Sequence, residues 1–504
     1  MRCLRATTST GPDGIPNILL KKLCGQLALP LSHIFTISFN SQQVPDDWKH
    51  AHVKPLFKNG VASDPNNYRP ISLTSTCCRV MERIINKELI DYLLDKSLVS
   101  KEQHGFIRRR STCSNLLECL QDWMLSIDNK RITDVIYIDF KKAFDQVSHN
   151  KLLLKLNSYG ITGDLYGWIK SFLSNRTQAV KLDGCLSSVI AILSGVPQGS
   201  VLGPILFVLF INDLVDCFKN LAVSTKLFAD DLKLYTSYGL TDSSCDLTEA
   251  LHRVTVWAKK WQLTINSTKC NVLRIVNPRC KNKSDIVYDL NGSSLKVLSV
   301  VKDLGVAVDK NLRFDNHISS VVHKSLQRAN LILKCFQSRD RSLLMKAFKV
   351  YVRPLLEYAT PVWSPHFMYL ILKIEHVQRS FTKRLFGLKN LTYIDRLKQL
   401  EIDTLERRRL IYDLCTCFKI IHGYNDTCLD MNRMHLEGRP NNTRGHNLKL
   451  AKEMCRTDML RFFFCNRICT VWNSLPLDVV NAPSVNSFKK RVSKFNLDRF
   501  LTLK

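Results

Sequence analysis

The sequence predicts an α+β fold, and three observations support this prediction. An acidic tetrapeptide at Phe228–Asp231 lies between two apolar runs, which is the pattern of a tight turn between strands. A short apolar run at 135–139 ends in an aspartate and is followed by a loose helical stripe. Beyond residue 309, the segments 317–360 and 367–425 carry apolar residues at helical spacing with scattered lysines and arginines.

The composition indicates packed domains with a polyanionic partner. The 504 residues include 73 Lys and Arg against 44 Asp and Glu, which gives a formal net charge of +29. Such a charge favours nucleic acid whatever its base sequence. A hydrophobic share of 45% and a charged share of 23% argue against a disordered basic tail, although a basic structural protein would have the same bulk composition.

The run VIYID predicts a buried central strand with Asp139 at its end. The segment that follows, FKKAFDQVSHNKLLLKL, predicts a helix directly after the strand, because it spaces four apolar residues along one loose stripe: Ala143, Val147, Leu152 and Leu156. An ordinary aspartate at a strand end is the alternative interpretation of Asp139.

The segment from Ser194 to Leu214, SGVPQGSVLGPILFVLFINDL, predicts a loop that leads into a buried helix. Gly195 and Gly199 would let the backbone approach a flat ligand surface, and the Gln198 amide supplies donors and an acceptor. A plain Gly-Pro turn before a core helix explains the same pattern. The apolar run at 201–211 has eleven residues, well short of the roughly 20 that a membrane helix needs.

The acidic turn is a candidate metal site. At a tight turn Asp230 and Asp231 can reach one side, where two carboxylates repel unless a cation joins them. Mg²⁺ prefers such oxygen ligands together with substrate phosphates. If the strand ending in Asp139 lies antiparallel beside this turn, the three carboxylates form the cage used in two-metal phosphoryl transfer. A solvated acidic turn is the alternative.

Further along, strand-like segments with turn punctuation occupy 270–308, and no long Pro/Gly/Ser linker marks a domain boundary. The eighteen cysteines show no CxxC spacing, and Met1 opens no secretory signal. Reduced thiols are therefore expected in place of a zinc or disulfide framework.

Nine stretches follow one another along the chain: STGPDGIP, WKHAHVKPLFK, NNYRPISLTST, QHGFIRRRST, YIDFKKAFDQVSH, SGVPQGSVLGPILF, LFADDL, WQLTINSTKCNVLRI and VKDLGVAVDKNLRF. In this order they resemble the reverse transcriptases of non-LTR (LINE-type) retrotransposons, particularly the jockey-like group. VRPLLEYATPVWSP, VQRSFTKRLFGL and VWNSLPLDVV resemble the family's region beyond the polymerase core, so the resemblance reaches almost to the C-terminus.

The resemblance implies an RNA-directed DNA polymerase with a right-hand fold. Fingers and palm are expected over 1–308, with the motif core at about 40–308, a helical thumb and connection over 309–425, and a C-terminal region of unknown role over 426–504. The implied partners are an RNA template, a DNA primer and a deoxynucleoside triphosphate, with no membrane. Two Mg²⁺ ions, or Mn²⁺ in their place, are the implied cofactors, and the implied location is intracellular, with the nucleus expected during insertion.

Carried over to this chain, the family pattern assigns a role to each of several residues. Asp139, Asp230 and Asp231 become the metal ligands, and Lys269 the group that stabilises pyrophosphate as it leaves. The residues implied to bind the nucleotide are Lys58, Arg69, Phe144, Gln198 and Gly199, with Phe144 under the sugar. Leu304 and Gly305 are implied to hold the primer terminus. Helix-core packing is the alternative for Phe144, a solvated surface for Lys269 and hairpin packing for Gly305.

Two departures from the family pattern are visible. Gly105 and Phe106 are followed by Ile107 and three arginines, Arg108–Arg110, where relatives commonly carry a glycine. The arginines are expected to strengthen contact with a template backbone, unless they form a solvated face. Relatives also carry an endonuclease upstream and often a CCHC zinc knuckle, so the resemblance implies a truncated reading frame. A polymerase-dead RNA-binding module is therefore the second hypothesis, and a maturase-like RNA-folding factor the third.

Overall fold

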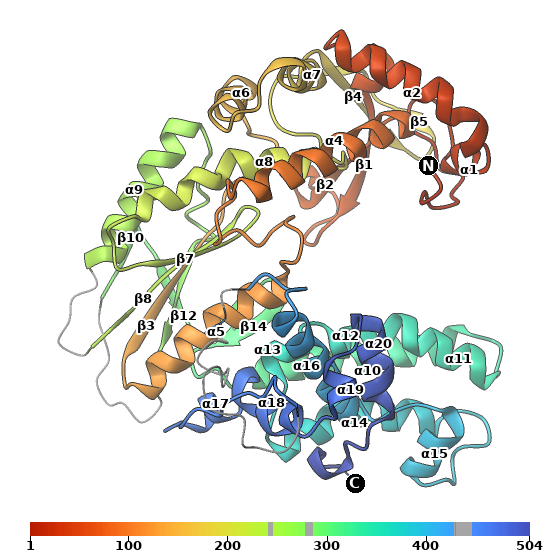
Figure 1. Cartoon of the computed structure of the whole chain (residues 1–504), viewed down its shortest axis with the longest axis vertical. Coiled ribbons are helices and arrows are strands. Elements are labelled where there is room, and N and C mark those ends of the chain that lie inside the picture. Colours follow the sequence, from red (N-terminus) through yellow and green to blue (C-terminus); the bar gives the residue numbers. More distant parts are fainter. Residues whose placement is uncertain (240–244, 278–285, 428, 430–445, 504) are drawn as a thin grey trace.

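The computed structural model describes residues 1–239, 245–277, 286–427, 429 and 446–503. Figure 1 shows the elements laid out along an arc. Elements from the first hundred residues lie at one end, a sheet lies in the middle, and the helices that follow residue 315 form the other end. Helices and mostly antiparallel strands thus combine as the α+β prediction requires.

The middle sheet has five strands in the order β12-β9-β3-β8-β7. β3 (Ile132–Ile138) lies at its centre, antiparallel to both β8 (Asp231–Tyr238) and β9 (Asn271–Ile275). The edge strands are β7 (Ser224–Phe228), antiparallel to β8, and β12 (Lys296–Leu298), parallel to β9. The buried central strand predicted from VIYID is confirmed, and it begins earlier, at Ile132.

Both faces of this sheet are covered, which explains why its central strand is apolar throughout. Val135 and Tyr235 pack against α5 (Thr112–Asp128), where the Tyr235 ring meets Trp123 edge-on with 5.8 Å between centroids. Ile136 and Leu234 join a second core with α8 (Gly203–Ile211) and α9 (Cys245–Trp261). Because side chains alternate along a strand, positions 139 and 231 continue the face that α5 covers.

The helix expected directly after β3 is present only in part. α6 spans His149–Ser158, whereas residues 141–146 form turns. Lys142 has φ +43°, which an α-helix excludes, and the Phe144 carbonyl accepts a hydrogen bond from the Val196 N–H at 2.9 Å. Ala143 and Val147 are buried all the same. The prediction of a helix over residues 141–146 was wrong. The apolar residues there are spaced as in a helix because they are buried against the 194–196 loop, although the backbone is not helical.

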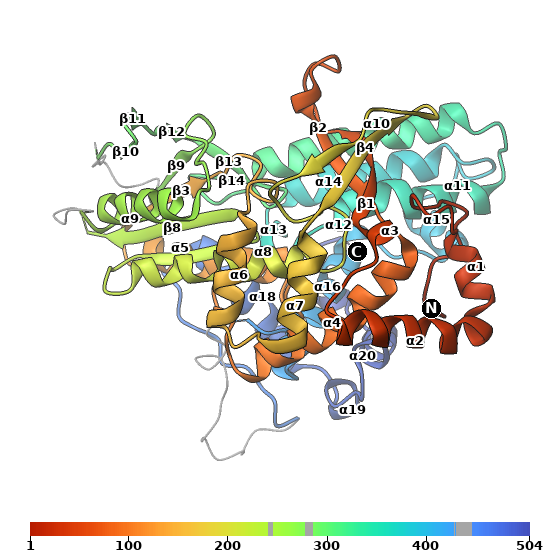
Figure 2. The ribbon, with the colours of Figure 1, turned by 90° about the horizontal axis from the view of Figure 1, so that it is seen from above.

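A second sheet lies toward the N-terminal end. β1 (His50–Phe57) and β2 (Tyr68–Leu73) form an antiparallel hairpin, and β4 (Arg176–Leu182) runs parallel to β1. β5 (Cys185–Leu186) and β6 (Ile190–Ile192) both pair antiparallel with β4. Figure 2 shows the loop between β1 and β2 projecting away from the helices. The helices of this part are α1 (Asn17–Lys22), α2 (Cys24–Asn40), α3 (Asp46–Lys49), α4 (Thr76–Asp95) and α7 (Gly163–Leu173).

After the small β10–β11 pair (Asp289–Leu290 and Ser293–Ser294) comes the hairpin of β13 (Val300–Asp303) and β14 (Val306–Asp309). No further strand follows among the residues described up to 503. The helices there are α10 (Asp315–Cys335), α11 (Arg341–Ala347), a π-helical turn (Phe348–Val352), α12 (Arg353–Glu357), α13 (Thr360–Trp363), α14 (Met368–Lys383), α15 (Tyr393–Leu400), α16 (Leu405–Ile421), α17 (Asp458–Arg461), α18 (Phe464–Asn473), α19 (Leu477–Val480) and α20 (Val485–Lys494).

Helices on both sides of residue 426 pack in a single hydrophobic core. Phe418 of α16 stacks on Phe488 of α20 with 4.4 Å between ring centroids, and Trp472 of α18 lies fully buried beside them. Within the described part of the chain, every helix is too short or too polar to cross a bilayer.

Acidification is expected to destabilise this helical part through His317, which is 4% exposed. Its Nδ1 accepts a hydrogen bond from the Ala307 N–H at 3.2 Å, and burial lowers its pKa to about 4 from 6.5. Between these two pH values the unfolded chain binds a proton that the folded chain does not, so stability falls as the pH falls, by about 3 kcal/mol at pH 4. Urea unfolding from pH 4 to 7 measures this effect. His317→Gln, which cannot titrate, should show a shallower pH dependence, and parallel curves would contradict the assignment.

Candidate active site

The three carboxylates singled out from the sequence meet at one end of the middle sheet. Phe228 pairs with Asp231, which leaves Ala229 and Asp230 as a two-residue hairpin loop between β7 and β8. Ile138 pairs with Leu232, so Asp139, one residue beyond β3, comes beside Asp231. The predicted hairpin turn and the predicted antiparallel neighbour are both confirmed.

The electrostatics of the site show an excess of negative charge. Burial, followed by the charge of Asp139, raises the pKa of Asp230. Burial, followed by the charges of Asp230 and Asp303, raises the pKa of Asp231 to about 7. Asp231 is an exposed residue, but the protein atoms around its carboxylate remove part of the hydration of the charged form. The three negative charges therefore repel one another, and a bound cation would reduce this repulsion.

The donor set suits divalent metal bound jointly with substrate. Among the described residues, no three Asp, Glu, His or Cys side chains stand close enough to form a ready-made metal cluster. Mg²⁺ does not require one, because it commonly takes one or two carboxylates and completes its shell with water and substrate phosphates. Hard oxygen ligands with raised pKa values therefore fit Mg²⁺ or Mn²⁺ at this place.

Asp139 is held by the segment that precedes β9. The Asn266 side-chain amide donates to Asp139 Oδ2 at 3.0 Å, and the Asn266 backbone N–H donates to the Asp139 carbonyl at 2.7 Å. Lys269 Nζ lies 3.9 Å from Asp139 Oδ2 and is largely exposed. The structure thus places Lys269 beside Asp139, where the family resemblance implies it, although its side chain is also solvated. Asn266 was missed, because only the fold shows that it contacts Asp139.

Lys58 and Arg69 lie at the loop end of the β1–β2 hairpin. Lys58 follows β1, and its N–H donates to the Asn67 carbonyl at 2.8 Å. Arg69 of β2 pairs with Leu56 of β1. Both side chains are exposed, and their positive charges counter the raised pKa of Asp230. They are therefore within electrostatic reach of the carboxylates from the other sheet.

Phe144 lies in the turns after β3, half-buried, with its ring stacked on Phe207 of α8 at 4.2 Å and 16°. Its partner in the core is thus a helix, although it does not itself belong to one. Gln198 is fixed from two sides: its Nε2 donates to Asp145 Oδ1 at 2.8 Å, and its carbonyl accepts from the Ser72 N–H at 2.7 Å. Asp145 was not anticipated from the sequence.

Gly199 has a packing reason to be glycine. Its φ is +119°, and a Cβ there would lie 2.5 Å from the Ser72 carbonyl oxygen. A Cβ on Gly195 would likewise lie 2.8 Å from the Asp145 backbone. Both glycines let the loop approach neighbouring backbone, so the expectation that they make room for a ligand is not needed to explain them.

Leu304 and Gly305 form the left-handed turn between β13 and β14, with φ values of +44° and +90°. The Tyr358 hydroxyl donates to the Leu304 carbonyl at 2.8 Å and forms a second hydrogen bond with the Thr112 hydroxyl at 3.1 Å. At the base of this turn, Asp303 pairs with Lys233 of β8 at 2.9 Å. Lys233 lies two residues from Asp231 on the same strand, so the turn is tied directly to the carboxylate site.

Residues 56–308 match the family model described as "Reverse transcriptase (RNA-dependent DNA polymerase)", which is half of the 504-residue chain. All of the site residues described above fall within this match. The chain belongs to the reverse transcriptase family. This confirms the resemblance inferred from the nine ordered stretches.

Two curated relatives of this reverse transcriptase are proteins of mobile elements. It is 30% identical over 382 residues to the "Probable RNA-directed DNA polymerase from transposon BS" of Drosophila melanogaster, covering 72% of this chain and 41% of that protein. It is 30% identical over 396 residues to the "RNA-directed DNA polymerase from mobile element jockey" of Drosophila funebris, covering 76% and 43%. The chain thus spans about two fifths of the length of these relatives. A solved structure of apo telomerase from Candida tropicalis, truncated from the C-terminal domain, has 14% identity and a TM-score of 0.39, covering 57% of this chain and 59% of that chain.

Gln103 is a residue of this reverse transcriptase that sequence reasoning missed. It is fully buried, and its amide holds the backbone of the acidic turn from both sides. Its Oε1 accepts from the Ala229 N–H at 2.9 Å and from the Gly105 N–H at 2.8 Å, and its Nε2 donates to the Ala229 carbonyl at 3.3 Å. Ala229 has φ +56°, so this amide fixes the strained residue immediately before Asp230.

Lys233 and Asp303 form a buried ion pair that was also missed. Both side chains are at most 4% exposed, and Lys233 Nζ donates to Asn115 Oδ1 at 2.5 Å as well. The charge of Asp303 contributes to the raised pKa of Asp231, and that of Lys233 opposes it. The sequence did contain one indication of this pair, because Lys233 is a charged residue within an apolar strand and follows Asp230 and Asp231 closely.

The arginine run after Gly105 does not form one basic face. Arg108 pairs with Asp91, and the largely buried Arg110 pairs with Asp426 at 3.1 Å while donating to the carbonyls of Ser100 and Gln103 at 2.7 Å each. Arg110 thus stabilises the segment that carries Gln103. Three arginines were expected to contact the template backbone, but Arg108 and Arg110 have acidic partners within the chain.

Proposed function

We propose that the chain is the RNA-directed DNA polymerase of a non-LTR retrotransposon. It would transfer a nucleotide from a deoxynucleoside triphosphate to the 3′-hydroxyl of a DNA primer on an RNA template. The observation that carries the proposal is the meeting of Asp139, Asp230 and Asp231 within the segment that matches the family. The net charge of +29 supports nucleic-acid partners. In this proposal residues 1–308 are fingers and palm, 309–425 thumb and connection, and 426–504 an appended region.

Asp139, Asp230 and Asp231 are proposed to hold two divalent ions, Mg²⁺ or Mn²⁺. When bound, such ions lower the pKa of the primer 3′-hydroxyl and neutralise charge on the leaving pyrophosphate. The raised pKa values of Asp230 and Asp231 support this role, because each carboxylate gains by pairing with a cation.

The cations of the site are proposed to act on the triphosphate. Arg69 and Lys58 bind its phosphates from the second sheet, where a planar guanidinium suits phosphate oxygens bidentately. Lys269, beside Asp139, stabilises or protonates the pyrophosphate as it departs. Among the described residues, none of these three side chains forms an ion pair shorter than 3.9 Å. Their positive charges therefore remain available to the phosphates.

The remaining predicted residues position the substrates. Phe144 is proposed to lie under the sugar, where its ring excludes a 2′-hydroxyl, and its stack on Phe207 holds the ring in place. Gln198, fixed by Asp145 and Ser72, and Gly199 are proposed to contact the nucleotide. The left-handed turn at Leu304 and Gly305 is proposed to contact the primer end, and its link through Asp303 to Lys233 supports that place.

Extension of a DNA primer on an RNA template by the purified chain tests the proposed function. Incorporation of deoxynucleotides that requires Mg²⁺ or Mn²⁺ and stops on chelation is the expected result. Salt-sensitive RNA binding without extension in any divalent metal would overturn the enzyme and leave an RNA-binding remnant.

Phe144→Ala is expected to relax the choice of sugar. Without the ring, a ribonucleotide no longer meets a steric barrier, so the preference for deoxy- over ribonucleotide should fall about 10- to 100-fold. Single-nucleotide incorporation from dGTP and GTP, each over a concentration series, measures the ratio. Deoxynucleotide incorporation by the variant controls for folding, and an unchanged ratio would show that Phe144 only packs against Phe207.

A further inference from the structure

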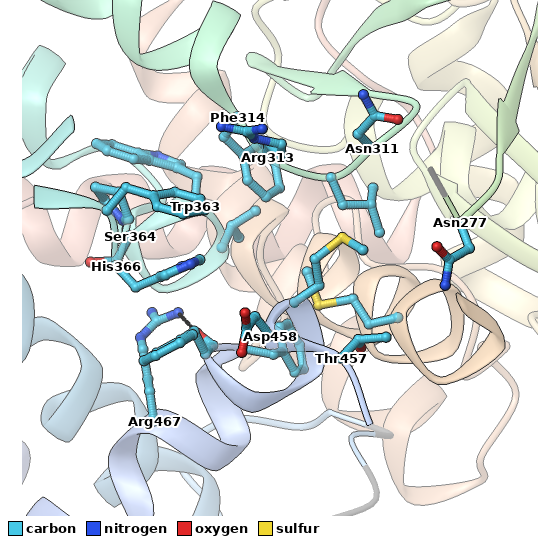
Figure 3. Close-up of a pocket in the computed structure, with 18 of the residues that line it drawn as sticks. Asn277, Asn311, Arg313, Phe314, Trp363, Ser364, His366, Thr457, Asp458 and Arg467 are labelled. Atoms are coloured by element: carbon cyan, nitrogen blue, oxygen red, sulfur yellow. Dashed lines mark hydrogen bonds between the residues drawn. The ribbon is translucent and has the colours of Figure 1, made fainter. Parts of the chain in front are cut away.

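A second candidate site lies away from the carboxylates. A cavity of about 360 Å³ opens between the end of the β9 segment, the β14–α10 loop, the α13–α14 loop and helices α17 and α18 (Figure 3). Its lining combines residues from five distant parts of the sequence, among them Met124 of α5, and it contains none of the residues to which the proposed function gives a role. The cavity is of the size that holds small ligands.

One wall of this cavity is a stack of flat side chains. The His366 ring lies parallel to Phe462, at 4.1 Å and 5°, and Phe367 lies on its other side at 4.0 Å. Arg313 covers the far face of the stack, 5.0 Å from the Phe367 centroid. Phe462 is 37% exposed. Burial lowers the pKa of His366, so the stack is neutral at pH 7 apart from its arginine. A column of this kind offers a platform for a planar base.

The polar groups of the cavity select among bases. Figure 3 shows the Asp458 carboxylate, from α17, directed into the cavity between His366 and Thr457. Its charge acts on His366, which confirms that the two are close. An ionised carboxylate offers acceptors only. Guanine alone presents two adjacent donors, N1–H and N2–H, on its Watson–Crick edge, whereas adenine and cytosine place an acceptor beside their single amino group and uracil has no amino group.

The rim of the cavity is basic. Arg456 and Arg313 are exposed there, and Arg313 is oriented by Asp315 at 3.2 Å and by the Tyr369 hydroxyl at 3.0 Å. Arg467 is held by Asp413 at 2.8 Å and by the Pro361 carbonyl at 2.8 Å. The exposed Arg456 guanidinium, beside a base-sized cavity, suits a phosphate next to a bound nucleotide. Within single-stranded RNA, unstacked bases are recognised by this combination of stacking and edge contacts.

We propose that this cavity binds an unstacked guanine nucleotide of single-stranded RNA, stacked on Phe462 and read by Asp458. The site is separate from the polymerase site, so it would let the protein recognise an RNA feature while the template occupies the carboxylates. The inference goes beyond the proposed function and does not depend on it.

The test is binding of a fluorescent uridine octamer with one central guanosine, measured by anisotropy. A saturating unlabelled template–primer without unpaired guanines occupies the polymerase site. Replacing the guanosine by adenosine should weaken binding about tenfold, and inosine, which lacks the 2-amino group, should fall between them. Asp458→Asn should remove the difference between guanosine and adenosine.

Phe462→Ala should weaken binding of all three octamers, and Phe386→Ala, which removes an aromatic ring that is 75% exposed elsewhere, should change nothing. Equal binding of guanosine and adenosine octamers by the unmodified chain, or a preference that survives in Asp458→Asn, would overturn the proposal. Equally tight binding of an octamer of the same base sequence made of deoxyribonucleotides, or full competition by GMP at the octamer's own affinity, would overturn the assignment to RNA. Primer extension and thermal melting of the same samples report folding and the polymerase separately.

Discussion

Asp230→Asn is expected to reduce deoxynucleotide incorporation about a thousandfold. Asp230 lies at the hairpin tip, and its carboxylate is proposed to hold divalent metal with Asp139 and Asp231. Losing one charged ligand removes several kcal/mol of transition-state stabilisation, and each 1.36 kcal/mol is a factor of ten in rate. Single-turnover extension of a primer on RNA by the two proteins measures the loss.

The fold should survive this change. Burial and the charge of Asp139 raise the pKa of Asp230, so its ionised form costs stability at pH 7 and the neutral amide does not. Without metal, the melting temperature of the variant should therefore equal or exceed that of the unmodified chain. Asp183→Asn is the matched control, because Asp183 lies exposed in the two-residue loop between β4 and β5. Equal rates for Asp230→Asn and Asp183→Asn would remove Asp230 from the reaction.

Gln103→Met is expected to have the second largest effect, on both stability and rate. Methionine fills the same space but leaves the Ala229 N–H and carbonyl and the Gly105 N–H without their buried partner. Buried polar groups left unsatisfied cost about 1–3 kcal/mol each, so the free energy of unfolding should fall by about 3 kcal/mol or more. Since Asp230 directly follows Ala229, a displacement of about 1 Å should slow incorporation about a hundredfold.

Urea unfolding and primer extension, each with and without added metal, separate the two effects of this substitution. A purely structural role would lower stability and leave the rate per folded molecule and the metal requirement unchanged. A positioning role raises the metal concentration needed for half-maximal rate at a temperature where the variant remains folded. Gln327→Met, an exposed glutamine on α10, is the control and should behave as the unmodified chain. A folded Gln103→Met protein with normal metal dependence would contradict the positioning role.

The positions of the three carboxylates could be predicted from the sequence because each lies in a local backbone feature, a turn or a strand end. Asp230 and Asp231 fall in a turn between two apolar runs, and Asp139 ends an apolar run, so each could be placed from its neighbours alone. The prediction of a helix directly after β3 was wrong because Ala143 and Val147 are buried by a loop some fifty residues away in the sequence. Residues buried in this way can show the same apolar spacing as a helix without having helical backbone.

Contacts between distant segments could not be read from the chain. Gln103 meets Ala229, Lys233 meets Asp303, and His366 meets Phe462 only after the strands and helices have packed. None of these pairs has a spacing that predicts it, since each joins residues about 70 or more positions apart. They are nevertheless the contacts that fix the acidic turn, tie the β13–β14 hairpin to it, and form the second cavity.

The central claim is that Asp139, Asp230 and Asp231 together hold the metal ions of a polymerase. Counting bound Mn²⁺ by electron paramagnetic resonance tests it most directly, in a complex with an RNA template, a primer lacking its 3′-hydroxyl and the matching deoxynucleoside triphosphate. Two ions per chain in the unmodified protein and at most one in Asp230→Asn are the expected result. Two ions retained by Asp230→Asn, or none bound by either protein, would contradict the claim.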